Sequence, residues 1–162
     1  MNIFVLSYDP IEAAQLQCSK HVTKMLLETA QLLSAAHRIL DNIPPTDGLY
    51  YKVTHKSHPS TLWVMESVEN YNWTYQHFIG LCDEYTYRYG KIHKTDEKLR
   101  IILATPPQNI KYIPMTPFKL AMKSNPECMS DDAVDSYRKY YRTKKDKFKM
   151  VWTKREVPSW ML

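Results

Sequence analysis

The sequence predicts an all-α protein with a single domain spanning residues 1–162. We expect a compact bundle of three main helices, with short extra helices, proline-rich loops and an extended N-terminal segment. The length suits one domain with a proper core, and the hydrophobic and charged fractions, 44% and 24%, are ordinary for a globular protein. Only three glycines argue against a turn-rich β sandwich or barrel, and ten prolines suggest rigid connections between helices. Apolar residues recur at intervals of three and four along three stretches, which is the spacing of amphipathic helices.

The longest of these stretches is Ser19–Asp41, which predicts the central helix. At 100° per residue, its apolar positions share one broad arc: Val22, Met25, Leu26, Leu32, Leu33, Ala36 and Leu40. Upstream, the apolar run Asn2–Leu6 predicts either one strand or an extended segment laid on the core. Asp9 followed by a proline starts a short helix from Pro10 to about Gln17, because Asp accepts from free backbone N–H groups and proline fits the first turn.

A second helical stretch covers Ser60–Tyr89, with a break near Ser67 and with Gly90 as its C-terminal stop. Its aromatic and thiol side chains recur at four and three, which predicts core packing: Tyr71, Tyr75, Phe78, Cys82, Tyr85 and Tyr89. A short helix is expected to begin at Thr95 and end near Ile102. The proline-containing stretch Gln108–Asn125 predicts an irregular arm that crosses the surface or lines a cleft.

The third long helix is expected to begin after Ser130 and to continue through Trp152. Nine of the 22 basic residues fall between Arg138 and Arg155, and the net charge of the chain is +5. A polyanion such as DNA is the partner that this density favours, since phosphates release counterions on contact. The candidate contacts are Arg138, Arg142, Lys145 and, in the aromatic tail, Trp160. The alternative is an ordinary exposed face rich in lysine.

One polar row on the central helix is the candidate reaction site. His21, Lys24, Glu28 and Gln31 are spaced three, four and three, which stacks their side chains beside the apolar face. Glu28 is the candidate acid/base, and we expect His21 and Lys24 to orient a substrate that Gln31 also contacts. The alternative is a solvated helix face with a Lys24–Glu28 ion pair.

Two further groups of residues are candidates for substrate binding. His55 and His58 lie in a polar loop, where they would hydrogen-bond or contact phosphate, unless the loop is purely structural. With no third or fourth ligand nearby, we expect no metal, and no glycine-rich nucleotide motif indicates a cofactor. Arg88, Tyr89 and His93 place basic and aromatic groups at a helix end, where they would hold phosphate and stack a base. Complementarity to the helix dipole explains that cluster equally well.

The cysteines indicate the compartment. Cys18, Cys82 and Cys128 are far apart and odd in number, so we expect free thiols and a cytoplasmic protein. The N-terminus has no basic region before an apolar run, which argues against a signal peptide. No apolar run approaches the ~20 residues of a membrane helix, so no membrane partner is expected. The sequence makes no prediction of oligomeric state.

Three stretches together resemble the pyrimidine-dimer DNA glycosylase family, which includes the endonuclease V of T-even phages. The first is SKHVTKMLLETAQLL, where His21 and Glu28 match a histidine and a glutamate seven residues later. The second is YKVTHKSHPSTLW with LCDEYTYRYGKIH, similar to the family's "YKNHPQL" loop and basic, aromatic helix end. The third is the basic, aromatic C-terminus ending in Pro-Ser-Trp. The chain is also similar to small phage proteins that begin MNIFVLD, which would place it in an infected bacterial host.

The resemblance implies a helical glycosylase whose N-terminal α-amine attacks the sugar C1′ and forms an imine, with a glutamate assisting and basic residues holding DNA. Glu28 matches that glutamate, and the α-amine of Met1 is the candidate nucleophile. The sequence departs from the family at three positions. Residue 2 is Asn, where the family exposes a small residue after Met removal, and Leu27 and Gln31 stand where the family has basic residues.

The predicted function is therefore cleavage of an N-glycosidic bond in DNA by a glycosylase-like enzyme. Two alternatives remain open at this point. One is an enzyme of phage counter-defence that cleaves, or a protein that sequesters, a small cyclic or NAD-derived nucleotide, with histidines acting on the phosphodiester. The other is a DNA-binding protein without catalytic activity.

Overall fold

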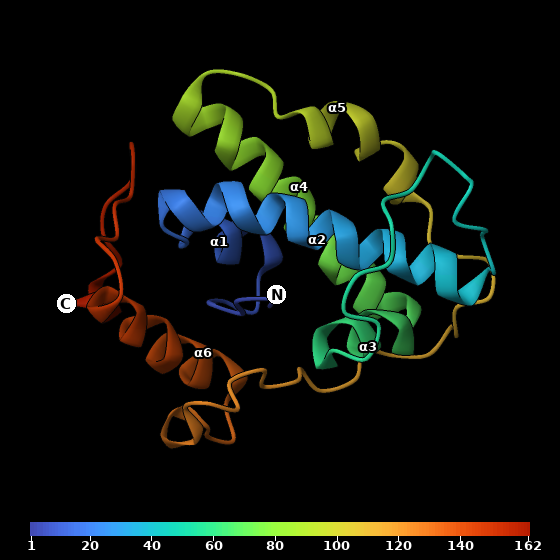
Figure 1. The fold of residues 1–162 in the computed structure, drawn as a ribbon. Coiled ribbons are helices and arrows are strands. Elements are labelled where there is room, and N and C mark those ends of the chain that lie inside the picture. The colour runs from blue at the N-terminus through green and yellow to red at the C-terminus, as the bar shows by residue number, and fades with distance from the viewer.

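The computed structural model describes residues 1–162 and contains helices but no strands (Figure 1), which confirms the all-α prediction. The α-helices are α1 (Pro10–Gln15), α2 (Ser19–Leu40), α3 (Pro59–Glu66), α4 (Val68–Tyr89), α5 (Lys94–Leu99) and α6 (Ala133–Arg142). Short 3-10 turns follow α5 and α6, precede α6 and end the chain. None of the helices combines the length and hydropathy that a membrane span requires.

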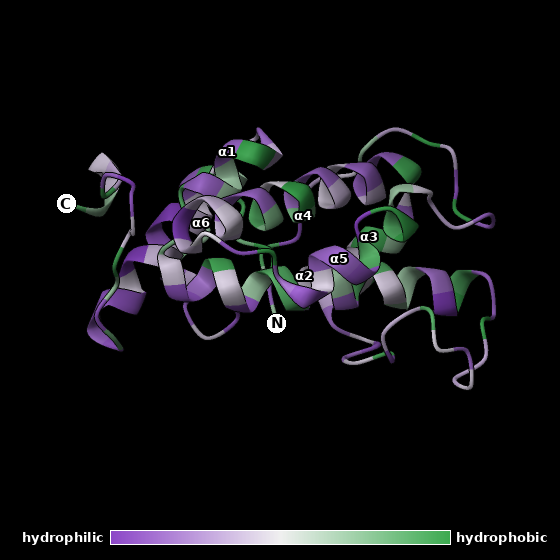
Figure 2. Ribbon diagram, turned by 90° about the horizontal axis from the view of Figure 1, so that it is seen from above, coloured by the Kyte–Doolittle hydropathy of each residue, from purple (hydrophilic) through white to green (hydrophobic).

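The two 22-residue helices, α2 and α4, pack against each other at the centre of the molecule (Figure 1). Both carry hydrophobic and hydrophilic bands along their length, as amphipathic helices do (Figure 2). Helix α1 lies close against α4 at Gly80, where an added Cβ would come within 3.0 Å of the Ala14 Cβ. The three cysteines are buried and unpaired.

Residues 2–6 form no strand, and Leu6 lies in a bend, where its N–H donates to the Phe4 carbonyl at 2.9 Å, so the run is laid on the core as the second of the two expectations has it. Ile3, Phe4, Val5 and Leu6 are each at most 4% exposed. In the view of Figure 1 the segment enters the middle of the molecule below α2, between α3 and α6. The chain therefore begins inside the helical bundle rather than on its surface.

The C-terminal helix is shorter than predicted. Helix α6 ends at Arg142, and a 3-10 turn over Thr143–Asp146 follows it, so a helix through Trp152 is wrong. Lysines at like-charged helical spacings, such as Lys145 and Lys149, disfavour continuation. The segment after the turn instead lies along the start of α2, where the Trp152 Nε1–H donates to the Leu16 carbonyl at 2.8 Å.

Two helix starts also differ from the prediction, because histidines cap them. Helix α3 begins at Pro59 rather than at Ser60, because His58 is its N-cap and the His58 Nδ1 accepts from the Ser60 N–H at 3.0 Å. In the same way, the His93 Nδ1 accepts from the Thr95 N–H at 3.0 Å at the start of α5. The break near Ser67 and the stop at Gly90, in the left-handed conformation with φ 69°, are as predicted.

Arg38 fixes the loop that leads from α2 towards His58. Its buried guanidinium donates to four backbone carbonyl groups of this loop, at distances from 2.5 to 2.8 Å: Pro44, Asp47, Tyr50 and Tyr51. Hydrogen bonds to a charged donor are the stronger ones, so a loop without regular structure is held in one conformation.

Buried His77 gives a pH test of this packing. Its Nδ1–H donates to the Pro10 carbonyl at 2.9 Å, and its Nε2 lies 3.2 Å from the Gln17 amide nitrogen. Burial lowers the pKa of His77 to about 4. Between about pH 6.5 and 4, His77 is therefore protonated in the unfolded chain, where its pKa is near 6.5, but neutral in the folded protein. The free energy of unfolding consequently falls as the pH drops through this range.

We therefore predict that His77→Gln reduces the pH dependence of stability. Near pH 5, the slope of unfolding free energy against pH should fall by about 1 kcal/mol per pH unit, which is nearly one proton. Urea unfolding between pH 4.5 and 7 measures this slope. Gln76→Ala, a change at the exposed neighbouring position, is the control and should leave the slope as it is. If His77→Gln has the same slope as the wild-type protein, His77 is not the source of the pH dependence.

Candidate active site

The α-amine of Met1 lies beside the carboxylate of Glu28. The amine nitrogen is 3.5 Å from Glu28 Oε1, and the Glu28 side chain is 17% exposed. Glu28 Oε2 is buried and has no hydrogen-bond partner. Buried carboxylate oxygens are normally paired, so this oxygen is an acceptor left open. An amine next to a partly enclosed carboxylate can act as a nucleophile and proton acceptor pair.

Asn2 holds the amine in this place. Its Nδ2 donates to the Ala121 carbonyl at 2.8 Å, and its Oδ1 accepts from the Ile3 N–H at 2.8 Å and from the Tyr137 hydroxyl at 3.1 Å. The residue after Met1 is thereby fastened to both α6 and the irregular arm. The Met1 side chain turns towards the first turn of α3, where its sulfur lies 3.9 Å from the Thr61 hydroxyl.

The charges of this pair affect His58. Burial is the main cause that lowers the pKa of His58, and the positive charges of the Met1 amine and His55 lower it further, against the opposing effect of Glu28. His58 therefore lies within electrostatic reach of both members of the pair. His55 is exposed, has a positive φ of 50°, and its carbonyl accepts from the Thr61 hydroxyl at 3.0 Å.

A cavity of about 480 Å³ opens next to His58. Its walls come from the start of α3, the irregular arm and α6, and include His58, Pro59, Met122, Lys123, Ser124 and Tyr140. The volume lies within the roughly 300–1,000 Å³ that is usual for small-ligand sites. The sequence pattern did not single out Tyr140 or Lys123, since neither belongs to a recognisable motif.

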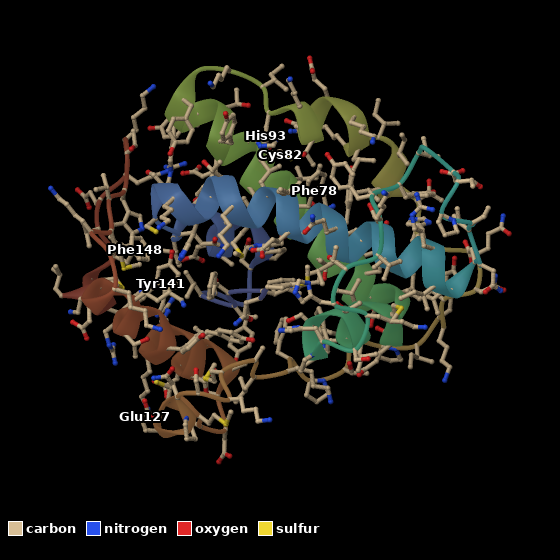
Figure 3. The ribbon with its side chains drawn as sticks, in the orientation of Figure 1. Phe78, Cys82, His93, Glu127, Tyr141 and Phe148 are labelled. Atoms are coloured by element: carbon tan, nitrogen blue, oxygen red, sulfur yellow. The ribbon has the colours of Figure 1, made fainter.

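His21 is placed differently from the other members of the polar row. It is 6% exposed, stacks on Phe4 at 5.0 Å between ring centroids, and its Nδ1 lies 2.7 Å from the Tyr141 hydroxyl. Burial, followed by the charges of three lysines, lowers its pKa to about 3. Tyr141 and Phe148 lie near each other at this end of α2 (Figure 3). His21 is thus a neutral, enclosed side chain, and its catalytic role stays a prediction.

Two further lysines lie within electrostatic reach of the row at Lys24 or of each other. Lys24 is exposed and Gln31 half-buried. The Lys144 Nζ lies over the Tyr140 ring, 4.6 Å from its centroid, and burial together with the charges of Lys147 and Lys24 lowers the pKa of Lys144. Lys144 was missed as a site residue, although its position four residues after Tyr140 places both on one helical face.

Arg88, Tyr89 and His93 do not adjoin the Met1–Glu28 pair. Arg88 is 3% exposed and bonds to Glu84 at 2.9 Å and to the Gln15 carbonyl at 2.9 Å. The Tyr89 hydroxyl donates to the Ser19 carbonyl at 3.3 Å. His93 caps α5 and appears near the top of Figure 3, away from the N-terminal segment. Their contacts connect parts of the fold.

In the C-terminal region, the residues predicted to contact DNA bond largely to backbone carbonyl groups of the protein itself. The Arg138 guanidinium lies over the Trp160 ring at 5.2 Å and donates to the Leu6 carbonyl at 2.9 Å. Arg142 donates to the Trp160 carbonyl at 3.0 Å, and Lys145 to the Met161 carbonyl at 3.1 Å. These donors fold the tail back onto α6, and their contact with substrate stays a prediction.

Comparison with known proteins identifies the family. A family model described as pyrimidine dimer DNA glycosylase matches residues 1–98, three fifths of the chain. No curated protein and no solved structure matches. The matched part contains Met1, Glu28 and His58 and ends before the arm and α6. The match covers more than half of the sequence, so this chain belongs to the pyrimidine dimer DNA glycosylase family.

Proposed function

We propose that the protein cleaves the N-glycosidic bond of a damaged pyrimidine nucleotide in DNA, with the α-amine of Met1 as nucleophile and Glu28 as acid/base. Membership of the family supports a DNA glycosylase-like function and DNA as the substrate. The observation that carries the assignment of residues is the 3.5 Å separation between the Met1 nitrogen and Glu28 Oε1.

The chemistry follows from this separation. The amine must lose a proton to attack C1′, and the adjacent carboxylate can accept it. As the bond from the Met1 nitrogen to C1′ forms, the bond from C1′ to the base breaks and its electron pair leaves with the base. The negative charge of Glu28 also stabilises positive charge that develops on the sugar. Loss of a second amine proton and opening of the sugar ring then give the imine.

The lysines near the pair suit a DNA backbone. Lys24 is exposed, and Lys144 and Lys147 lie close enough to one another for their charges to interact. Such groups attract phosphates and make binding depend on salt. Arg138 and Arg142, by contrast, already donate to backbone carbonyl groups, so we assign the phosphate contacts primarily to the lysines.

The first test is Glu28→Gln, which keeps the shape of the side chain but removes its charge. Cleavage of the N-glycosidic bond in a duplex with a cyclobutane thymine dimer, measured under single-turnover conditions as thymine freed after photochemical reversal of the dimer, should fall about 100-fold or more. The matched control is Glu97→Gln, at an exposed position on α5. Glu97→Gln should retain the wild-type rate.

The outcomes separate the proposal from its alternatives. Salt-dependent DNA binding with no glycosidic bond cleavage by the wild-type protein would indicate a non-catalytic DNA-binding protein. Turnover of cyclic or NAD-derived nucleotides, with none on DNA, would assign the site to a small nucleotide. Glu28→Gln with an unchanged rate of glycosidic bond cleavage would remove Glu28 from the mechanism.

The second test identifies the nucleophile. Borohydride reduction during reaction with an abasic duplex should trap a covalent adduct, and mass spectrometry of its peptides should place the adduct on the Met1 nitrogen. One asparagine inserted between Met1 and Asn2 keeps a large residue after Met1, moves the amine by about 3.8 Å and should abolish trapping. An adduct on a lysine, or undiminished trapping after the insertion, would show that a different amine attacks.

A further inference from the structure

The side chain of Asn2 belongs to a closed ring of hydrogen bonds. Its Nδ2 donates to the Ala121 carbonyl at 2.8 Å, the Ala121 N–H donates to the Tyr137 hydroxyl at 3.1 Å, and that hydroxyl donates to the Asn2 Oδ1 at 3.1 Å. The Tyr137 hydroxyl also donates to the Lys119 carbonyl at 2.7 Å, so its proton is shared between two acceptors. The ring joins the N-terminal segment to α6 and to the irregular arm.

The surroundings of this ring keep it closed at neutral pH. Asn2 and Tyr137 are both buried, so water does not compete for these bonds. Burial raises the pKa of Tyr137 to about 12, which keeps the hydroxyl proton in place. Each member of the ring donates one hydrogen bond and accepts another, and bonds in such a chain strengthen one another. We therefore expect the Asn2 side chain to occupy a single position.

Met1 itself is held from two further directions. Its side chain is 1% exposed, and its sulfur lies 3.9 Å from the Thr61 hydroxyl in the first turn of α3. Its amine lies 3.5 Å from Glu28 Oε1 on α2. The side chain, the amine and the next residue thus each contact a different part of the fold. Such fixing affects the rate, because a nucleophile displaced by about 1 Å can react about 100-fold more slowly.

The partners of Asn2 in this ring lie outside the part of the chain that matches the family model. The match ends at residue 98, whereas Lys119, Ala121 and Tyr137 follow it. The match therefore assigns no role to these residues. Their hydrogen bonds nevertheless converge on the residue that directly follows the nucleophile, so the arm and α6 affect where the amine lies.

We propose that Tyr137 is a positioning residue for the reaction: through Asn2, its hydroxyl holds the Met1 amine beside Glu28 in the place from which the amine attacks C1′. The proposal rests on the proposed function, because it names the group that fixes the same nucleophile. Tyr137 acts only through Asn2, so its hydroxyl takes no part in proton transfer. The arm and α6 then serve the chemistry as well as the fold.

The experiment measures borohydride trapping on an abasic duplex, with protein in excess and at a series of protein concentrations. The rate at saturation reports the position of the amine, whereas the concentration at half-saturation reports DNA binding. Tyr137→Phe keeps the aromatic ring and removes the hydroxyl. Its rate at saturation should fall about 10- to 100-fold, while its half-saturation concentration should stay within about threefold of wild type.

A second variant tests whether Tyr137 acts through Asn2. Asn2→Leu keeps a large residue after Met1 but removes every hydrogen bond of the Asn2 side chain. It should show a similar loss of rate at saturation. Tyr137→Phe added to Asn2→Leu should slow trapping no further, because the hydroxyl then has no link to the amine.

Tyr71→Phe is the matched control. Tyr71 is also buried, and its hydroxyl also donates to a backbone carbonyl, that of Leu103, at 2.7 Å. Both Tyr→Phe variants therefore lose a buried hydroxyl, and their thermal unfolding midpoints should fall by similar amounts. Tyr71→Phe should nevertheless keep the wild-type rate of trapping at saturation.

The outcomes distinguish failure of this inference from failure of the proposed function. The positioning role is overturned, while the Met1–Glu28 assignment stands, if Tyr137→Phe keeps the wild-type rate at saturation or if Tyr71→Phe loses as much. It is also overturned if only the half-saturation concentration changes, or if the losses of Tyr137→Phe and Asn2→Leu multiply in the double variant. If the wild-type protein traps no abasic DNA, the proposed function fails, and this inference fails with it.

Discussion

The burial of the N-terminal segment is the constraint on which the site depends. An extended run in the interior has no helix or sheet to satisfy its backbone groups, so side chains must do so. The Asn2 Oδ1 accepts from the Ile3 N–H, and Arg138 donates to the Leu6 carbonyl; the Asn2 side chain also bonds to the Ala121 carbonyl and the Tyr137 hydroxyl. These bonds connect both ends of the segment to distant parts of the chain. As a result the amine of Met1 has a fixed position beside α2, although nothing regular precedes it.

The cationic side chains divide into two groups with different uses. Arg38 and Arg88 are buried, and Arg142 is half-buried; each commits donors to carbonyl groups or to a carboxylate of the fold. Lys24 and Lys144 have no such bonds, and they lie close enough to each other for their charges to interact. This division follows from chemistry: the planar guanidinium matches several fixed acceptors at once, whereas the flexible ammonium suits mobile phosphates. The net charge of the sequence therefore overstates the number of groups that are free to meet DNA.

Long periodic segments were predictable from the sequence, and long-range contacts were not. The apolar arcs of α2 and α4 depend only on residues within each helix, so their boundaries came within a residue or two. The end of α6 depends on Trp152, whose partner is the Leu16 carbonyl far along the chain. In the site, Glu28 was named through a family resemblance, but its distance from Met1 depends on how the N-terminal segment is buried. Only the fold shows that Arg88 is enclosed.

Two histidines that cap helices in the same way lie in different surroundings. His58 and His93 each cap a helix through Nδ1, so both present an Nε2–H on the opposite edge of the ring. For His93 that edge belongs to a ring packed against Tyr85, at 5.0 Å between centroids. His58 instead lines a cavity of about 480 Å³ and lies within reach of the charges of the Met1 amine and of Glu28, whose buried Oε2 has no hydrogen-bond partner. Polar groups left open in the interior destabilise the free protein, but they can be satisfied by a bound transition state, and that difference is the source of catalysis.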